Sequence, residues 1–223
     1  MEMCQLDKIY LYHLSNYNKV LVQRNKLLKD FSFYPESAAM LDILDEQLVQ
    51  YGSVLIKMRD QFIKNLNEIL KEIHRSLSGR KETLVMEYEN NTGIEEFGQV
   101  LFKNREKDIR TRVTNTGPHR DDLCFMISGI DIRKYGSQGQ QRTAALSLKL
   151  AEIEIVKQNV KDTPVLLLDD VLSELDSSRQ RYLLESIHDI QTMITCTGID
   201  DFVSYNFQIN KLFQVIEGTV YEK

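Results

Sequence analysis

The chain has 223 residues, of which 42% are hydrophobic and 27% charged, and its formal net charge at pH 7 is −5. This is the composition of a globular protein, and no apolar run approaches the length of a transmembrane helix, about 20 residues. Three widely spaced cysteines, Cys4, Cys124 and Cys196, argue against a disulfide framework or a zinc site and favour a reducing cytoplasm.

The net charge conceals an uneven distribution along the chain. Residues 162–189 carry seven acidic residues against two arginines, whereas residues 103–112 carry five basic residues against two acidic ones. Residues 53–81 are also basic, with seven basic and three acidic residues. Because basic segments neutralise phosphates even in an acidic protein, the composition leaves a nucleic-acid partner open.

The first 80 residues predict two long helices. The first covers about residues 6–29, and the second runs from Pro35 to about residue 78, where Gly79 suits the position after a helix end. Apolar residues recur in the second helix at steps of three and four, as in a helical seam. The seam consists of Leu41, Leu44, Leu48, Tyr51, Leu55, Met58, Phe62, Leu66, Ile69 and Ile73. We expect an antiparallel hairpin, with an intermolecular coiled coil as the alternative.

Beyond residue 80 the pattern changes to strands and shorter helices. We expect a strand at residues 82–89, a polar helix at 94–108, and two short strands on either side of Ser128 and Gly129. The later elements expected are a helix at 139–159, a buried strand at 164–168, a helix at 175–188 and a buried strand at 192–195. This alternation predicts one half of an α/β sheet.

The sequence VLLLDD at residues 165–170 joins an apolar strand to two carboxylates. In α/β folds the carboxyl end of a buried strand lies at the edge where ligands bind. A Walker B strand has this form, with Asp169 placed for Mg²⁺ and Asp170 placed to orient or deprotonate an attacking water. The alternative is a structural strand that happens to end in acidic residues.

A second signal is YGSQGQQRTAALSLKLAE at residues 135–152. Gly136 and Gly139 free the backbone around Ser137, directly before an amphipathic helix. Exposed amides at a helix N-terminus, with a serine hydroxyl beside them, form an anion site. The alternative is that Ser137 only caps the helix and the glycines only make a turn.

The order of these segments points to a family. The glycine-rich helix start precedes the acid-terminated strand, and SELD follows at residues 173–176. This is the order of the signature, Walker B and D-loop motifs of ABC ATPases, with Gln138 in place of a signature glycine. Since TGPHRDD also occurs upstream at residues 116–122, the chain resembles the RecF family of ABC/SMC-like DNA-repair ATPases over nearly its whole length.

The resemblance implies a fold and partners. The fold would be the α/β fold of a P-loop NTPase, ABC/SMC-head-like but incomplete. It would carry an α-helical hairpin subdomain at residues 1–80, followed by the C-terminal part of the ATPase head at 81–223. The complete protein would be a cytoplasmic, ATP-dependent homodimer that binds DNA, works with recombination mediator proteins and has no membrane partner.

The resemblance also implies roles for individual residues. In ABC-type dimers the signature of one subunit contacts ATP held by the P-loop of the other. Carried over, Asp169 would bind Mg²⁺ and Asp170 would be catalytic, its short side chain suiting a weak ATPase. The residues expected to contact or sense the nucleotide are Ser137, Gln138, Gly139, Gln140 and Asp176. Thr195 and Thr197 follow the last strand, where many ABC proteins have a histidine.

Basic residues upstream of these motifs predict a DNA surface, for which a solvated helix face is the alternative. They are Lys103, Arg105, Lys107, Arg110 and Arg112. His119 and Arg120 in TGPHRDD either contact phosphate or take part in catalysis, or they stabilise a turn through a His–Asp pair.

The phosphate-binding loop G-x-x-x-x-G-K-[ST] does not occur in this sequence. We therefore expect a piece of a longer protein, inactive as an ATPase by itself and completed by a P-loop on another segment. Two other interpretations are a non-enzymatic protein-interaction module, with the helical hairpin as its docking element, and the head fragment of a different SMC-like protein.

Overall fold

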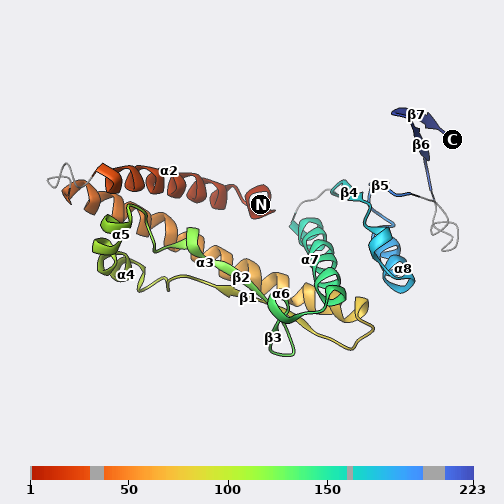
Figure 1. Cartoon of the computed structure of the whole chain (residues 1–223), viewed down its shortest axis with the longest axis horizontal. Helices are drawn as coiled ribbons and strands as arrows, with labels where there is room; N and C mark the ends of the chain where they lie inside the picture. The colour runs from red at the N-terminus through yellow and green to blue at the C-terminus, as the bar shows by residue number, and fades with distance from the viewer. Residues whose placement is uncertain (1, 31–37, 160–162, 198–208) are drawn as a thin grey trace. The chain divides into compact units, whose positions relative to one another are not determined.

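The structure is a computed structural model that describes residues 2–30, 38–159, 163–197 and 209–223 (Figure 1). The chain divides into two compact units, residues 1–160 and 161–223. No helix in these described ranges is long and apolar enough to cross a membrane.

Two long helices form the frame of the first unit, as the sequence predicts. They are α2 (Lys8–Asp30) and α3 (Ala38–Leu77), preceded by the short helix α1 (Glu2–Leu6). A hydrogen bond from Arg24 to Asp45 joins the end of α2 to the start of α3. Another, from Arg59 to Tyr10, joins a later part of α3 to the start of α2, so the two helices are antiparallel. The predicted hairpin is confirmed, whereas the predicted turn around Pro35 lies outside the described residues.

The ends of these helices follow from local chemistry. The Asp7 carboxylate accepts hydrogen bonds from the backbone N–H groups of Ile9 and Tyr10, which caps α2. After α3, Gly79 has a φ of +65°, and the N–H of Arg80 reaches back to the carbonyl of Arg75 at 2.6 Å. Gly79 therefore ends α3 as predicted.

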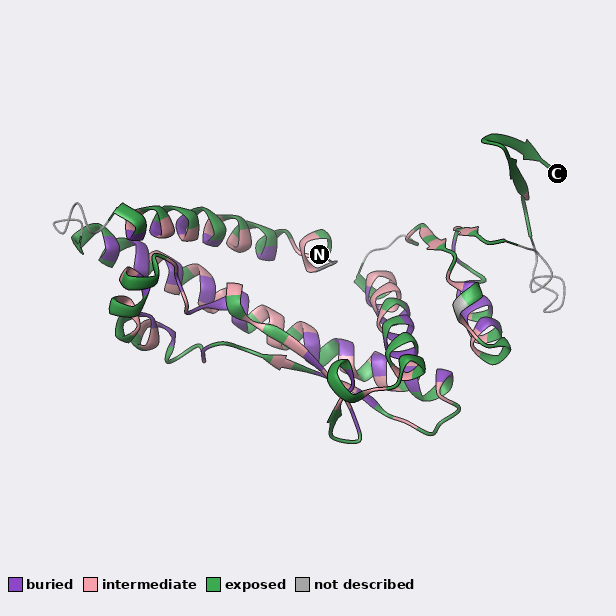
Figure 2. Ribbon diagram, in the orientation of Figure 1, coloured by how far each residue is buried: buried purple, intermediate pink, exposed green. Residues whose placement is uncertain are grey.

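The apolar seam of α3 serves two neighbouring cores of the first unit. Its first half packs on α2 and on α4 (Phe97–Lys103), and the buried residues of the two long helices face each other (Figure 2). Its second half packs on β1 (Leu84–Glu89) and α7 (Gln138–Asn159). Residues 1–80 therefore share these two cores with later elements of the first unit, which extends to residue 160.

A small antiparallel sheet lies against α3. β1 pairs with β2 (Asp122–Ile127), and β2 pairs with β3 (Ile130–Asp131). The β2–β3 turn has positive φ at both Ser128 (+52°) and Gly129 (+78°), as a two-residue type I′ hairpin requires. The hairpin is confirmed, but its second strand is shorter than predicted because α6 (Ile132–Tyr135) follows at once.

The polar helix predicted at residues 94–108 is two helices. Asn104 separates α4 from α5 (Arg105–Thr111), and Arg112 ends α5 in the left-handed conformation, with a φ of 57°. The 3₁₀ turn η2 (Pro118–Arg120) then leads into β2.

The second unit contains a two-stranded parallel sheet with one connecting helix. Its elements are β4 (Leu166–Asp169), η3 (Leu172–Glu174), α8 (Ser177–Ser186) and β5 (Thr192–Thr195). The strands and helix are confirmed, but the prediction that the strands are buried is wrong. Leu167 and Met193 are 69% and 64% exposed, because none of the second unit's own described elements covers that face of the sheet.

A further antiparallel hairpin follows, which was not predicted from the sequence. It consists of β6 (Phe213–Ile216) and β7 (Thr219–Glu222), and all of its strand residues are exposed. Its turn residues Glu217 and Gly218 both have positive φ, which again defines a type I′ turn.

Candidate functional site

Asp169 is the last residue of β4, at the carboxyl edge of the parallel sheet. It pairs in register with Thr195 of β5, whose hydroxyl donates a hydrogen bond to Asp169 Oδ1 at 2.5 Å. The carboxylate is exposed. Parallel pairing thus brings an acidic and a hydroxyl side chain together where ligands bind in α/β folds. Thr195 thereby has a definite position beside Asp169.

Asp170 follows in a backbone conformation that L-residues seldom adopt. Its φ is +51°, and its N–H donates to the carbonyl oxygen and the hydroxyl oxygen of Thr195, at 3.2 and 3.1 Å. The Ser173 hydroxyl donates to the Asp170 carbonyl at 2.8 Å. These bonds hold an exposed carboxylate on a strained turn, the kind of strain that concentrates at functional sites.

Asp176 caps α8. Its Oδ1 accepts hydrogen bonds from the N–H groups of Ser178 and Arg179 at 3.1 and 3.0 Å, and its other oxygen pairs with the Arg179 guanidinium. The buried Gln180 amide donates to the carbonyl of Leu172 at 2.9 Å. Two contacts therefore join the segment after β4 to α8, namely the Asp176 cap and the hydrogen bond from Gln180 to Leu172.

The residues named from the signature pattern lie at the start of α7. Gly136 makes the turn possible, since a Cβ there would stand 2.6 Å from the Ile132 carbonyl oxygen. Gln140 N–H donates to Ser137 Oγ at 3.2 Å, and Ser137 N–H donates to Gln140 Oε1 at 2.9 Å. This reciprocal arrangement is a capping box, so Ser137 does act as an N-cap.

Capping leaves other donors at this helix start exposed. Ser137, Gln138 and Gly139 are all exposed, and a Cβ on Gly139 would meet nothing closer than Ser137 Oγ at 4.0 Å. The first N–H groups of a helix have no partner within it and carry its partial positive charge. A phosphate oxygen therefore has room to approach the segment 137–140, which we call the signature segment.

The signature segment and the acidic residues belong to different compact units. Ser137 lies in the unit of residues 1–160, and Asp169, Asp170 and Asp176 lie in the unit of residues 161–223. In the described part of the chain, no group of three or more His, Cys, Asp or Glu side chains could hold a metal ion. At the end of β4, Asp169 and Thr195 together place one carboxylate and one hydroxyl group side by side as possible oxygen ligands.

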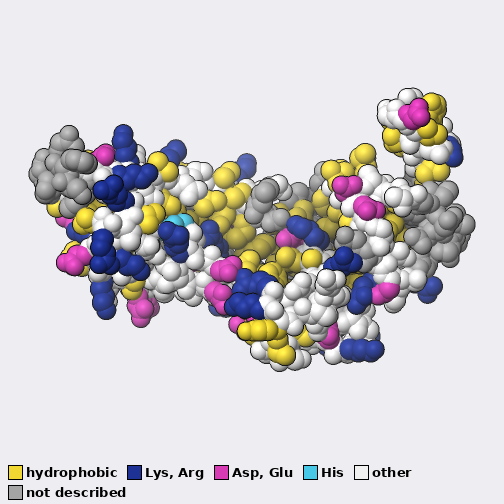
Figure 3. Space-filling model, in the orientation of Figure 1, with side chains coloured by type: hydrophobic (Ala, Val, Ile, Leu, Met, Phe, Trp, Pro, Cys, Tyr) yellow, Lys and Arg dark blue, Asp and Glu magenta, His cyan; other side chains and the backbone are white. Residues whose placement is uncertain are grey.

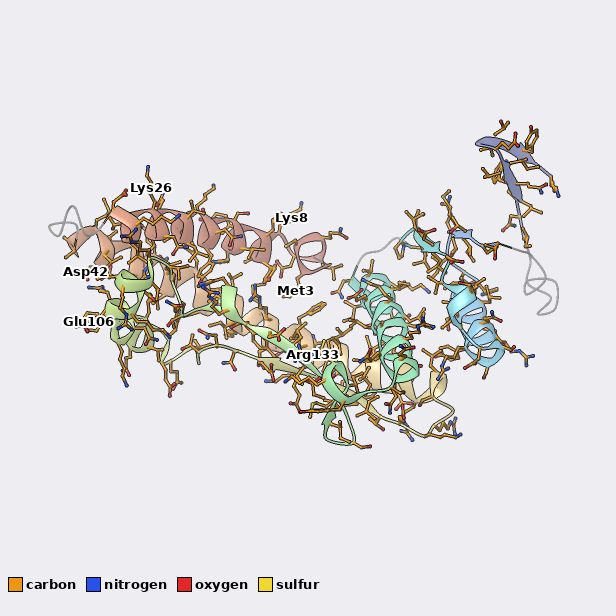
Figure 4. The ribbon with its side chains drawn as sticks, in the orientation of Figure 1. Met3, Lys8, Lys26, Asp42, Glu106 and Arg133 are labelled. Carbon is orange, nitrogen blue, oxygen red and sulfur yellow. The ribbon has the colours of Figure 1, made fainter. Side chains whose placement is uncertain are left out.

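Most of the predicted DNA-binding side chains are exposed on α4, α5 and the residue after them. Lysine and arginine side chains gather over this end of the helical hairpin (Figure 3), where Lys26, Asp42 and Glu106 lie on three different helices (Figure 4). Arg105 differs, because its Nη2 pairs with Asp42 and Asp45 at 2.7 and 2.6 Å. The exposed ones are Lys103, Lys107, Arg110 and Arg112.

A buried ionic cluster was not predicted from the sequence. Arg24 is 0% exposed, and its guanidinium donates to Asp45, Asp108 and Thr114 at 2.5, 2.8 and 2.9 Å. A signal was present, since Arg24 stands four residues from Val20 and four from Leu28 on the buried face of α2. Charge at an apolar position of a helix therefore marked the cluster, but its partners are far away in sequence.

The TGPHRDD segment is held in the structure by side chains of α2 and α3. His119 Nε2 lies 3.0 Å from the Thr114 carbonyl, which can only accept, so Nε2 carries the proton and Nδ1 accepts from the Tyr17 hydroxyl at 2.7 Å. Burial lowers the pKa of His119. Arg59 pairs with Asp121 at 3.1 Å. These contacts support the turn-stabilising interpretation of His119, with a tyrosine rather than an aspartate as its partner.

Comparison with known proteins finds relatives that match nearly the whole of this chain. No protein-family model matches the chain. It is 56% identical over 220 residues to the DNA replication and repair protein RecF of Agathobacter rectalis and 57% identical over 220 residues to that of Lachnoclostridium phytofermentans, covering 99% of this chain and 61% of each relative. The chain thus spans about three fifths of these relatives.

Two solved structures share its fold. The recombination mediator protein RecF-ATP in the RecFOR pathway has a TM-score of 0.88 and 34% identity, and the match covers 100% of this chain and 60% of that one. RecF-ATPrS has a TM-score of 0.85 and 36% identity, covering 97% and 59%. The α/β, ABC/SMC-head-like fold class expected from the sequence is confirmed.

Proposed function

Because this chain belongs to the RecF family, we propose that it provides the signature and Walker B part of an ATP-dependent DNA-binding protein of recombinational repair. The observation that carries the proposal is the exposed, glycine-flanked start of α7 in a chain whose fold matches RecF-ATP. The residues proposed to contact or sense the nucleotide are Ser137, Gln138, Gly139, Gln140 and Asp176.

The donor chemistry of the signature segment fits a terminal phosphate held by another polypeptide segment. The Ser137 hydroxyl and the first amides of α7 are neutral donors at the positive end of a 22-residue helix. Such a site stabilises a phosphate without a lysine, but it lacks the enclosing loop that provides most nucleotide affinity. We therefore propose that ATP joins two copies of the complete protein into a homodimer.

The acidic edge of β4 provides the second part of the proposed chemistry. Asp169, oriented by Thr195, would hold Mg²⁺, which neutralises charge on the phosphates when bound. Asp170 would accept a proton from the water that attacks the terminal phosphorus, as the bond to the ADP oxygen breaks. Asp176, the N-cap of α8, would communicate between the two nucleotide sites of the dimer.

A hybrid protein tests this proposal. In it, this chain replaces the matching segment of Agathobacter rectalis RecF, and dimerisation with ATP is followed by light scattering. We expect Ser137→Arg to abolish the ATP-dependent dimer and Asp170→Asn to slow hydrolysis about 100-fold or more while the dimer persists. An ATP-dependent dimer that tolerates Ser137→Arg would instead favour the interaction-module interpretation.

DNA is the proposed partner of the exposed basic residues around α5, in a cytoplasmic pathway shared with recombination mediator proteins. Each phosphate contact lowers affinity by about 0.9 log units per log unit of salt on duplex DNA. Lys107→Ala in the hybrid should therefore reduce the salt slope by about 1, and Lys211→Ala in the second unit should leave it unchanged. An affinity that does not vary with salt would remove DNA as a direct partner of this surface.

A further inference from the structure

A chain of polar contacts connects the signature segment to the end of α3. Gln140 Nε2 donates to Glu82 Oε1 at 2.8 Å, and Glu82 Oε2 lies 3.7 Å from Nε2 of His74. His74 is fully buried in the last turn of α3. Glu82 stands between that helix and β1, so one carboxylate touches both α3 and α7.

A second branch of these contacts runs along α7 itself. The Thr143 hydroxyl donates to the Gly139 carbonyl, and the Ser147 hydroxyl donates to the Thr143 carbonyl, both at 2.6 Å. Because the single hydroxyl proton of Ser147 is used there, its oxygen accepts from His74 Nδ1 at 3.0 Å. His74 therefore directs Nδ1–H toward α7 and its Nε2 edge toward Glu82.

Glu82 determines which way the Gln140 amide points. A side-chain amide has a donor end and an acceptor end, and an ionised carboxylate can only accept. Glu82 consequently holds the NH₂ end of Gln140, which leaves Oε1 facing the Ser137 N–H at 2.9 Å. If the amide turned over, its NH₂ would face that N–H and the capping box would be lost.

We propose that Glu82 is a positioning residue for nucleotide contact. It acts through Gln140 to keep the Ser137 backbone, and with it the Ser137 hydroxyl and the Gly139 amide, in the arrangement that a phosphate meets. In this role Gln140 orders the signature segment from within, and the hydrogen bond between His74 and Ser147 joins α7 to the last turn of α3. The inference rests on the proposed function for its consequence, but its structural part can be tested without nucleotide.

The structural part is tested by hydrogen exchange of the backbone amides in the 223-residue chain. In Glu82→Ala we expect the amides of Ser137 and Gln140 to exchange about tenfold faster, since one charge-assisted hydrogen bond orders them. Glu82→Gln keeps an acceptor and should restore rates to within about twofold of the wild type. Glu87→Ala, an exposed glutamate on β1, is the matched control and should change neither amide. Unchanged exchange in Glu82→Ala would overturn the inference.

The functional part uses the hybrid with Agathobacter rectalis RecF. Glu82→Ala should weaken the ATP-dependent dimer about tenfold while ATP affinity of the monomer stays constant, and Glu82→Gln should recover most of the loss. A dimer unaffected by Glu82→Ala contradicts the positioning role even if exchange is faster. If the unsubstituted hybrid forms no ATP-dependent dimer, the proposed function fails, and the exchange rates still decide whether Glu82 orders Gln140.

Discussion

At the scale of single residues, Gly117 is the position where the TGPHRDD segment depends most on having no side chain. Its φ is +128° and its ψ is 178°, and an added Cβ would stand 2.5 Å from the Tyr17 hydroxyl oxygen. Only glycine adopts this conformation readily. We expect Gly117→Ala to lower the free energy of unfolding by at least about 2 kcal/mol, measured by urea titration with circular dichroism.

Alanine variants of two other glycines distinguish the cost of a positive φ from the cost of a steric clash with the added Cβ. Gly129 also has a positive φ, +78°, but an added Cβ would meet nothing within 4 Å, so Gly129→Ala should cost only about 1 kcal/mol. Gly93 has neither feature, and its alanine variant should lie within about 0.5 kcal/mol of the wild type. Equal costs at all three positions would show that the contact with Tyr17 does not matter.

His119 gives the stability of the first unit a pH dependence. Burial lowers its pKa in the folded chain below the ordinary 6.5, and protonating Nδ1 would remove the acceptor for the Tyr17 hydroxyl. The unfolded chain therefore binds the proton more readily, so stability falls as the pH drops below about 6.5. Unfolding midpoints at about pH 7.5 and about pH 5.5 should differ more in the wild type than in His119→Gln. A steeper dependence in the variant would contradict this assignment.

The acidic residues at the end of β4 could be predicted from the sequence, but their surroundings could not. Asp169 and Asp170 could be named because an apolar run ends in them. The hydroxyl that orients Asp169 comes from Thr195, and the partner of His119 is Tyr17, 102 residues away along the chain. No local pattern carries such pairings, because tertiary packing determines them.

At the scale of elements, Arg24 joins α2 to α3 and α5 from inside the protein. Removing one partner of a buried ion pair leaves the other charge unpaired where water cannot reach it. We expect Arg24→Met to reduce the free energy of unfolding by about 3 kcal/mol, although it conserves most of the side-chain volume. Urea titration at neutral pH measures this change.

The matched control is Lys26→Met on the same helix. Lys26 is exposed, so its loss should alter the unfolding free energy by no more than about 0.5 kcal/mol. If Arg24→Met were as harmless as Lys26→Met, the buried cluster would contribute nothing to holding these helices together.

Elements marked by a long periodicity or by an apolar run were predicted, and short elements with neither feature were not. Steps of three and four over 40 residues specify α3, and apolar runs mark β4 and β5. β6 and β7 are four-residue strands of exposed side chains, which give no core-facing pattern to detect. The predicted helix at residues 94–108 is interrupted at Asn104, a local backbone choice that hydrophobic periodicity does not encode.

At the scale of the whole molecule, the second unit carries apolar surface that its own described elements do not cover. Leu167 and Met193 share the open face of the β4–β5 sheet. Parallel strands are ordinarily covered on both faces. The curated relatives extend beyond the matched segment, which covers about 61% of their length. These observations agree with the proposal that the ATP site requires a further polypeptide segment.

Calorimetric titration of MgATP tests this central claim most directly. The 223-residue chain and the hybrid with Agathobacter rectalis RecF are titrated under the same conditions. We predict no measurable heat of binding for the chain and saturable binding for the hybrid, because we expect the part of the relative outside the matched segment to provide the P-loop that encloses the phosphates. Saturable MgATP binding by the chain alone, at micromolar affinity, would contradict the account.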